Sequence, residues 1–208
     1  MNGEKANVAV LVSGGGTNLQ AILDRELAGD IPFGTVRVVI ADKPGVYALT
    51  RAENAGKEAL VIHKKALGSQ RLFEEKLTAA LEERQIDLIV LAGFLAILSR
   101  EFTDHFAGRI INVHPSLIPS FCGAGYYGLK VHEAALEKGV KVTGATVHFV
   151  NEIPDGGEII LQKAVRVYPG DTPEKLQKRV MRQAEWKLLP QAVAMLTEQI
   201  VKRRNEQP

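Results

Sequence analysis

Residues 7–20 read NVAVLVSGGGTNLQ: a short apolar run, three consecutive glycines and the first residues of a predicted helix. A strand, a Gly-rich turn and a helix in this order are typical of the first unit of a doubly wound α/β sheet. Glycines in the turn, Ser13–Asn18, let an anion approach the backbone at the amino end of the helix, where the helix dipole favours negative charge. The stretch therefore predicts an α/β fold with an anion site. The alternative is a tight turn that holds no ligand.

The kind of anion follows from what the Gly-rich turn lacks. No Gly-Lys-Ser/Thr follows the glycines, so the turn is not a nucleoside-triphosphate P-loop. Leu19 occupies the third glycine position of a dinucleotide fingerprint, and Asp42 lies further downstream than the acid that usually binds the ribose. The predicted ligand is therefore a single phosphate monoester. Thr17 and Gln20 are predicted to form a capping box at the start of the helix.

Beyond the turn, short β-rich runs alternate with amphipathic helical stretches, which predicts a doubly wound, mostly parallel open sheet. The loop at 151–157 contains Asp-Gly and separates two long β-rich runs, so we expect a hairpin and late antiparallel strands. The predicted strands are Asn7–Val12, Thr35–Ala41, Ala59–His63, Asp87–Ala92, Ile110–His114, Lys141–Val150 and Glu158–Val167.

Two helices have clear start signals. Ser69 is a predicted N-cap for a helix that ends at Arg84. Thr172-Pro173-Glu174 begins a later helix, which Pro190 is expected to interrupt or kink. No linker or repeat divides the chain, which predicts a single domain over residues 1–208. The apolar face of the helix between Ser69 and Arg84 is predicted to hold Leu72, Phe73, Leu77, Ala80 and Leu81.

The composition excludes several classes of protein. A net charge of +2 over 208 residues gives no basic surface for nucleic acid. The single cysteine, Cys122, rules out an intramolecular disulfide and fits a reducing, cytoplasmic setting. The apolar run Val8–Val12 is far too short to span a membrane, and no other segment approaches a span. Because no His, Asp and Glu set has the spacing of a metal site, we expect no metal.

A second polar motif, Asn112-Val113-His114-Pro115, ends the fifth predicted strand. The two-residue period of a strand places Asn112 and His114 on one face, at the carboxyl edge of the sheet. An amide donor beside an imidazolium suits an acyl-type transfer, in which a tetrahedral oxyanion must be stabilised. A core histidine bonded to the backbone gives the same pattern, so the motif alone leaves both interpretations open.

Asp155, in the predicted hairpin loop, is a third candidate. Its carboxylate could hold His114 protonated, raise the pKa of that imidazole and relay a proton through water. Asp-Gly-Gly is also ordinary turn chemistry, however. His148, in the strand TVHFV, is either a neighbour of this group or an edge residue. The other histidines, His63, His105 and His132, have no partner pattern.

Taken together and in this order, the motifs resemble the phosphoribosylglycinamide formyltransferase family from Val8 to about Pro190. The matching stretches are VLVSGGGTNLQ, LAGFLAILS, INVHPSLIP, GATVHFV and DGGEIILQ. The resemblance implies a formyltransferase-like fold and an enzyme of purine biosynthesis. Such an enzyme moves the formyl group of 10-formyltetrahydrofolate, its co-substrate, to the amine of 5-phosphoribosylglycinamide. Nucleotide binding would belong to about residues 1–95, and catalysis with folate binding to about residues 96–208.

The resemblance also implies residue roles. Asn112 and His114 match the groups that stabilise the oxyanion, Asp155 matches a proton-relay acid, and His148 matches a histidine near them. The nucleotide contacts match Gly16, Thr17 and Asn18 at the phosphate and Glu185 near the glycinamide end. The folate contacts match Arg71, Leu95, Ala96, Ile97, Leu98, Asn112, Asn151 and Glu152.

Three positions depart from the family pattern. Ala96 stands where an arginine is frequent, and Trp186 stands where a histidine commonly follows the acid. The family's Ser-Arg pair reads Ser69-Gln70-Arg71 in this chain. Either Arg71 takes over the contact with the folate tail, or that contact is weaker.

Three rival interpretations stand beside this one. A formyltetrahydrofolate deformylase shares the catalytic segment, but it usually reads NIHH and carries a regulatory domain ahead of the sheet. A methionyl-tRNA formyltransferase needs an additional basic RNA-binding domain. A non-catalytic nucleotide- or dinucleotide-binding protein explains the glycines but leaves Asn112, His114 and Asp155 without a role. A homodimer is compatible with all of them.

Overall fold

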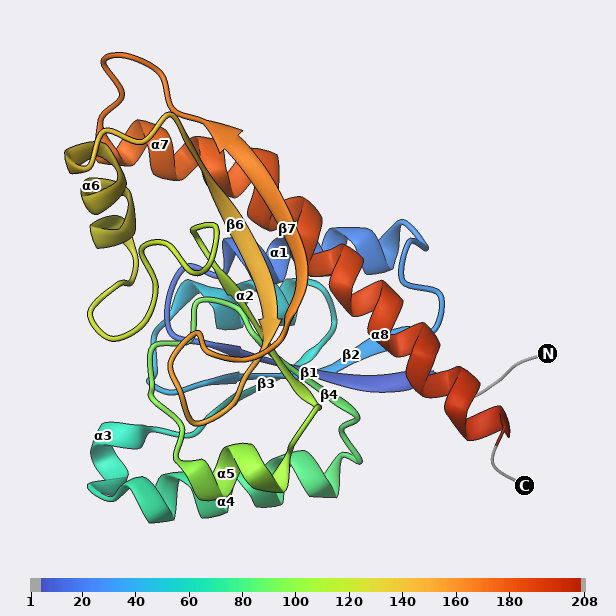
Figure 1. Cartoon of the computed structure of the whole chain (residues 1–208). Helices are drawn as coiled ribbons and strands as arrows, with labels where there is room; N and C mark the ends of the chain where they lie inside the picture. Colours follow the sequence, from blue (N-terminus) through green and yellow to red (C-terminus); the bar gives the residue numbers. More distant parts are fainter. Residues whose placement is uncertain (1–4, 207–208) are drawn as a thin grey trace.

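The computed structural model describes residues 5–206 and contains a seven-stranded sheet in the order β3-β2-β1-β4-β5-β6-β7 (Figure 1). Each predicted strand is present, with ends that differ by two residues at most. The strands are β1 Ala6–Val12, β2 Gly34–Ala41, β3 Glu58–Val61, β4 Leu88–Leu91, β5 Ile110–His114, β6 Val142–Phe149 and β7 Ile159–Arg166.

The sheet becomes antiparallel at β6, one strand before the hairpin that the sequence predicts between β6 and β7. Strands β1 to β5 pair in parallel, whereas β6 runs antiparallel to β5 and β7 runs antiparallel to β6. In the β5–β6 register, Asn112 lies opposite His148, and His114 lies opposite Thr146. The mostly parallel sheet with late antiparallel strands is therefore confirmed, and its register brings two candidate site residues together.

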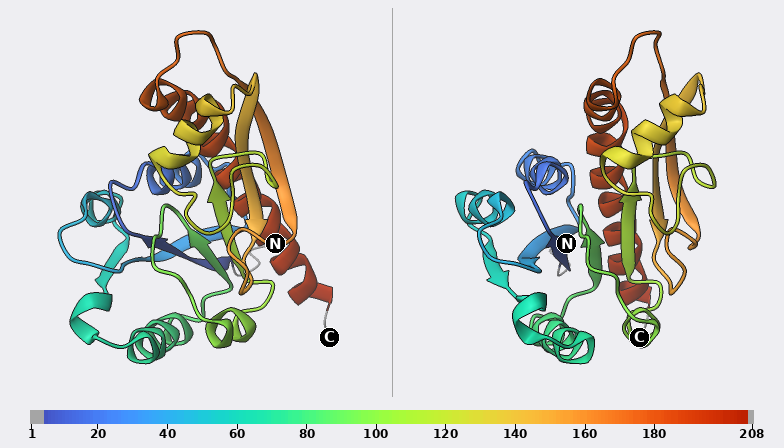
Figure 2. Two further views of the ribbon diagram at one scale, coloured as in Figure 1. Left: turned by 60° about the vertical axis from the view of Figure 1, so that its left-hand side comes forward. Right: turned by 90° about the vertical axis from the view of Figure 1, so that its left-hand side faces the viewer.

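Two apolar cores cover the two faces of the sheet, as expected for central parallel strands. On one face, Val8 and Val10 of β1 pack in a core with the first and last helices of the chain; on the other, Ala9 and Leu11 pack with Phe73 and its neighbours. Figures 1 and 2 show α4 and α5 together on one side of the sheet and α8 running along the other.

The helices complete the layers on both faces. Short helices α2, α3 and α5 were not predicted, since they span eight residues or fewer and α2 and α3 lack a side-chain cap. No helix within residues 5–206 is both long and apolar enough to cross a membrane. The helices are α1 Thr17–Leu27, α2 Tyr47–Asn54, α3 Lys64–Leu67, α4 Gln70–Glu83, α5 Arg100–His105, α6 Leu129–Glu137, α7 Pro173–Val180 and α8 Trp186–Glu206.

The predicted starts of α4 and α7 are confirmed, because Ser69 and Thr172 each accept a backbone N–H of the first turn. Leu72 is wrongly placed on the apolar face of α4: it is 41% exposed, since it lies off the line of Phe73 and Leu77. The predicted capping box of α1 is also wrong. Gly16, with a φ of 72°, is the N-cap and no side chain caps the helix.

Pro190 does not break the last helix. It lies inside α8, and a π-helical turn, Met181–Glu185, precedes α8 directly. Proline has no N–H for the carbonyl of the preceding turn, and a local change of bonding pattern is one way in which helices accommodate it. The irregular turn therefore lies before the proline, and it contains Glu185.

Candidate active site

The carboxyl ends of β1, β4 and β5 meet at one edge of the sheet. The chain places β2 and β3 on one side of β1 and β4 on the other, so the strand order switches between β1 and β4. Ligands of open α/β sheets bind at such a switch point. A hydrogen bond crosses it here, because Leu95 N–H donates to Ser13 Oγ at 2.9 Å. The Gly-rich turn and the loop after β4 are therefore held together.

Asn112, His114 and Asp155 come together at this edge. Nδ1 of His114 lies 3.3 Å from Oδ2 of Asp155, and both side chains are largely buried. Asp155 has a φ of 56°, and its Oδ2 accepts the backbone N–H of Gly123 at 2.8 Å. The predicted trio is therefore assembled, with the carboxylate oriented by a backbone group from the loop after β5.

His148 joins the trio and sets the orientation of Asn112. Its Nδ1 lies 2.7 Å from the carbonyl oxygen of Phe149 and must donate there, because a carbonyl only accepts. Nε2 of His148 lies 3.3 Å from Nδ2 of Asn112. Oδ1 of Asp155 lies 3.5 Å from the same Nε2. His148 thus contacts two members of the trio, and it is not an isolated edge residue.

The environment of His114 contradicts the expected rise in its pKa. Burial lowers the pKa below its ordinary value of 6.5, and it outweighs the Phe121 carbonyl and the Asp155 carboxylate, which both favour the charged form. Nε2 donates to the Phe121 carbonyl oxygen at 2.8 Å. The expectation of a raised pKa is wrong because desolvation is the largest effect on a ring that is 4% exposed.

Asp155 itself remains ionised. Burial raises the pKa of this carboxyl, but hydrogen bonds from His148 and Gly123 and the nearby imidazoles outweigh burial and lower it overall. The lowered pKa of Asp155 keeps its carboxylate negatively charged, and the lowered pKa of His114 keeps the imidazole neutral. The imidazole can take up a proton when a further negative charge develops beside it.

The Gly-rich turn is built for close approach of α2. A Cβ added to Gly16 would lie 2.7 Å from Cβ of Ala48, so only glycine fits at this position. The N–H of Ala48 donates to the carbonyl of Gly14 at 3.2 Å, and Nε of Arg51 donates to that of Gly15 at 2.8 Å. Arg51 was not singled out in the sequence, where nothing marks α2 as a neighbour of the turn.

Asn18 links the turn to the C-terminal part of the chain. Its Nδ2 donates to Oε2 of Glu185 at 2.8 Å, and both residues are buried. Burial raises the pKa of Glu185 to about 7, although the hydrogen bond from Asn18 opposes this. Two predicted nucleotide residues that lie 167 positions apart in the sequence are therefore in direct contact.

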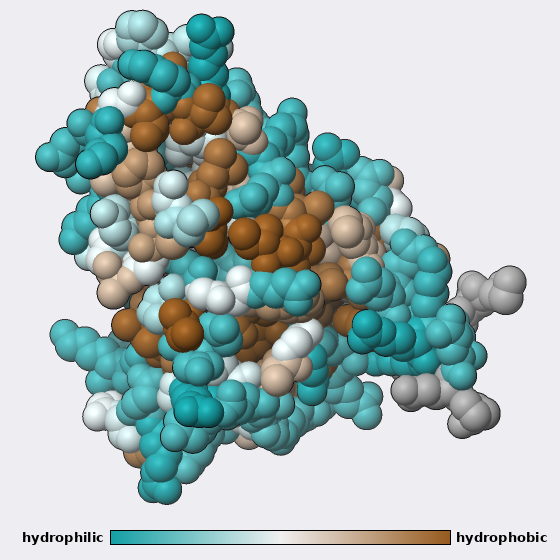
Figure 3. Space-filling view, viewed as in Figure 1, coloured by the Kyte–Doolittle hydropathy of each residue, from teal (hydrophilic) through white to brown (hydrophobic). Residues whose placement is uncertain are grey.

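The loop after β4 and the β6–β7 hairpin loop expose apolar side chains beside the trio. Leu95, Ile97 and Ile153 are 61%, 75% and 58% exposed. Figure 3 shows hydrophobic side chains gathered over the middle of the face viewed. Leu98 is buried and Ala96 half-buried. Such a surface fits a flat, partly apolar ligand ring.

A buried acid that the sequence did not reveal supports the first of these loops. Glu74 of α4 accepts the N–H and the hydroxyl of Ser99, each at 2.6 Å. Gln70 donates to Glu74 and to the carbonyl of Ile97, at 2.6 and 2.9 Å. Gln70 thus contacts the loop, at the position where the family pattern has arginine.

Among the residues that the structure describes, Arg71 has no hydrogen bond or ion pair with this loop. It pairs with Glu75 at 3.4 Å, and its side chain is 82% exposed. In the hairpin loop, Oδ1 of Asn151 accepts the N–H of Ile153 at 3.0 Å, which shapes the turn, while Glu152 is exposed. Within residues 5–206, no three His, Cys, Asp or Glu side chains are placed to bind a metal.

Comparisons with known proteins identify the family of this chain. A family model described as formyl transferase matches residues 6–193. Phosphoribosylglycinamide formyltransferase of Haemophilus influenzae is 41% identical over 92% of this chain and 87% of its own length. The crystal structure of glycinamide ribonucleotide transformylase 1 from Symbiobacterium toebii has 42% identity and a TM-score of 0.87, over 95% of this chain and 93% of that one.

Longer relatives share the same region. The human trifunctional purine biosynthetic protein adenosine-3 is 45% identical over 93% of this chain. The chain spans only 14–18% of the length of the trifunctional relatives it matches. The resemblance seen in the motifs is thus confirmed over most of the chain, and the chain belongs to the formyl transferase family.

Proposed function

We propose that this protein is a phosphoribosylglycinamide formyltransferase, which transfers the formyl group of 10-formyltetrahydrofolate to the amine of 5-phosphoribosylglycinamide in purine biosynthesis. The observation that carries the proposal is the assembly of Asn112, His114 and Asp155 at the switch-point edge, next to a Gly-rich turn. The names of relatives with 41% identity over most of the chain support it.

In the proposed reaction the substrate amine attacks the formyl carbon, and no protein group forms a covalent bond. Asn112 and His114 stabilise the oxyanion that develops on the formyl oxygen. His114 starts neutral because its pKa is lowered, and the developing negative charge favours its protonated form. Asp155 orients His114 and, through water, carries the amine proton toward the folate nitrogen that leaves.

The two substrates would approach this edge from different sides. Gly16, Thr17 and Asn18 would hold the phosphate, and Glu185 would lie near the glycinamide end, so the nucleotide half of about 1–95 is completed by one acid from about 96–208. Leu95 to Leu98, with Asn112, Asn151 and Glu152, would pack around the folate ring. Arg71, exposed on α4, remains the proposed contact for the folate tail. Holding both substrates in line supplies a large part of the acceleration.

We further propose that the chain acts as one domain on small molecules in the cytoplasm, without a metal, nucleic acid or membrane. A single cysteine, Cys122, which burial keeps poorly ionised by raising its pKa, fits a reducing compartment. A homodimer is compatible with this function, and sedimentation of the purified protein would establish the state.

The test is an assay of the purified protein with both substrates, in which formylated nucleotide and deformylated folate are measured separately. The proposal predicts equal amounts of the two products, and no folate breakdown when the nucleotide is omitted. Breakdown that does not depend on the nucleotide would establish a formyltetrahydrofolate deformylase instead. Binding of the nucleotide without any turnover would establish a non-catalytic binding protein.

A further inference from the structure

Arg51 is a half-buried cation whose orientation is set by three contacts. It belongs to the last turn of α2, and Nε donates to the carbonyl of Gly15 at 2.8 Å. Nη1 donates to Oε1 of Gln20 at 2.9 Å, and the guanidinium lies 4.8 Å from the centre of the Tyr47 ring. A long side chain held on three sides loses little further entropy when it binds a ligand.

None of these three contacts neutralises the charge of Arg51. A carbonyl, a carboxamide and an aromatic ring are all uncharged, and Arg51 forms none of the ion pairs among residues 5–206. Arg25, on the neighbouring helix α1, shows the usual alternative, since it pairs with Asp30 at 2.7 Å. Over the part of the chain described, Nη2 of Arg51 also has no hydrogen-bond partner.

The turn beside Arg51 keeps groups that a ligand would satisfy. Gly16 begins α1 without any side-chain cap, so the first N–H groups of this eleven-residue helix are left for another acceptor. Asn18 is 8% exposed, and its Oδ1 has no partner among the residues that the structure describes. An anionic group that carries a hydroxyl, as a sugar phosphate does, matches both features.

We propose that Arg51 is the cation that recognises the phosphate of the substrate and sets the preference for a phosphorylated ribosyl ligand. The proposal rests on the proposed function and deepens it. The Gly-rich turn supplies only neutral donors to the phosphate, so Arg51 would add the positive charge. Nη2 and the outer hydrogen of Nη1 would donate to phosphate oxygens in the fork geometry that arginine provides. Gly15, Gln20 and Tyr47 position the guanidinium and do not contact the ligand.

The test compares Arg51→Met and Arg51→Lys with Arg25→Met, an exposed arginine of α1 as the control. Each protein is assayed with 5-phosphoribosylglycinamide and with ribosylglycinamide, which lacks the phosphate, and inorganic phosphate is titrated by calorimetry. Arg51→Met should raise the KM for the phosphorylated substrate by about 10- to 100-fold, as expected for a lost charge-assisted hydrogen bond, with kcat nearly unchanged. Arg51→Lys should fall between Arg51→Met and the unmodified protein.

The two substrates separate recognition from a structural effect. The unmodified protein should prefer the phosphorylated substrate strongly, and Arg51→Met should lose most of that preference while treating ribosylglycinamide as before. Inorganic phosphate should bind the unmodified protein and Arg25→Met, and bind Arg51→Met much more weakly. An unchanged preference in a folded Arg51→Met protein would overturn the role of Arg51. If the proposed function itself is wrong, the unmodified protein makes no product from either substrate, and the phosphate titration still reports on Arg51.

Discussion

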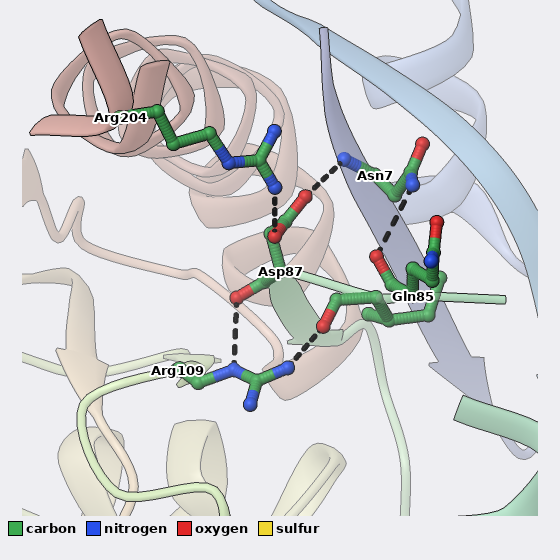
Figure 4. Close-up of a pocket in the computed structure, with 6 residues that line it drawn as sticks. Asn7, Gln85, Asp87, Arg109 and Arg204 are labelled. Atoms are coloured by element: carbon green, nitrogen blue, oxygen red, sulfur yellow. Dashed lines mark hydrogen bonds and ion pairs between the residues drawn. The ribbon is translucent and has the colours of Figure 1, made fainter. Parts of the chain in front are cut away.

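The two ends of strands β1 and β4 hold polar groups of opposite kinds. At the amino ends, a depression of about 410 Å³ is lined by charged groups that satisfy one another. Asp87 accepts the N–H of Asn7 at 2.7 Å and pairs with Arg204 (Figure 4). Arg109 donates to the backbone carbonyls of Ile86 and Asp87. At the carboxyl ends, by contrast, Glu185 and His114 are buried where their ordinary charge is disfavoured.

The contrast shows that a hollow lined by charges is not in itself a functional site. The amino-edge groups are committed to one another, and they tie α8 to the sheet. At the carboxyl edge, Glu185 and His114 have partners, but burial shifts their pKa values against their ordinary charge, and Oδ1 of Asn18 has no partner among the described residues. Shifted pKa values and open hydrogen-bonding capacity together mark the functional edge. Substitutions at the two edges should therefore move stability in opposite directions.

Glu185→Gln should give the largest stabilisation. The pKa of Glu185 is about 7 in the folded protein and 4.5 ordinarily. The fold favours the protonated form of this carboxyl, so the contribution of Glu185 to stability is fully present below pH 4.5 and is lost as the pH rises through 7. Glutamine keeps an acceptor for Asn18 but cannot ionise, so the free energy of unfolding at pH 8 should rise by about 3 kcal/mol.

Urea unfolding at pH 5 and pH 8 checks this prediction. The gain should be small at pH 5 and large at pH 8, and the KM for the nucleotide should rise. Glu198→Gln, at a half-exposed position of α8 where the side chain pairs with Lys202, is the control and should behave alike at both pH values. A gain for Glu185→Gln that is the same at both would contradict the raised pKa.

His132→Leu should remove a loss of stability in acid. His132 of α6 is fully buried, neither ring nitrogen has a partner within residues 5–206, and burial lowers its pKa from 6.5 to about 4. Between pH 6.5 and pH 4, His132 therefore binds a proton in the unfolded chain but stays neutral in the folded protein. Between pH 7.5 and pH 5 this costs about 2 kcal/mol of the free energy of unfolding.

The readout for His132→Leu is the pH dependence of unfolding, not the absolute stability, because leucine also changes the packing. The unfolding free energy of the variant should fall less between pH 7.5 and pH 5 than that of the unmodified protein. His105→Gln, an exposed histidine paired with Glu82, is the control. Identical pH dependence in His132→Leu and the unmodified protein would show that His132 is not held neutral.

Asp87→Asn at the amino edge should give the smallest effect and the opposite sign to Glu185→Gln. The variant loses the charge that binds the N–H of Asn7 and the guanidinium of Arg204, and the arginine is partly exposed and screened. Unfolding should become easier by about 1–2 kcal/mol, with kcat and both KM values unchanged. A large fall in kcat would mean that the amino edge takes part in function.

The fold and the placement of Asn112 beside His114 could be predicted because they depend on local periodicity, whereas Asp155 was joined to them only by the family resemblance. β5 is predicted at Ile110–His114, as the structure has it, and the two-residue period alone places Asn112 beside His114. The pairing of β6 with β5, which aligns His148 with Asn112, was not predicted, whereas the predicted hairpin correctly pairs β6 with β7. The confirmed inferences need only neighbours in sequence.

Other features depend on packing between elements that are distant in sequence. Arg51 was missed because its place at the Gly-rich turn depends on how α2 packs beside α1, β2 and β3. Gln20 was wrongly assigned to a capping box. The N-cap is Gly16 in a left-handed conformation, and its close contact with Ala48 of α2 is not visible in the sequence. The expected direction of the His114 pKa shift was wrong, since the sequence shows a charged neighbour but not the degree of burial.

The most direct test of the central claim is a double-mutant cycle on Asn112 and His114, with single-turnover formyl transfer measured at saturation and binding measured separately. Each alanine variant should lower the rate by about 10²–10³-fold, as expected for one lost oxyanion donor, with both dissociation constants nearly unchanged. Because the two residues serve one charge, the double variant should lose much less than the product of the single losses. Normal turnover at saturation with weakened binding, or single losses that multiply fully, would contradict a shared oxyanion site at the carboxyl edge.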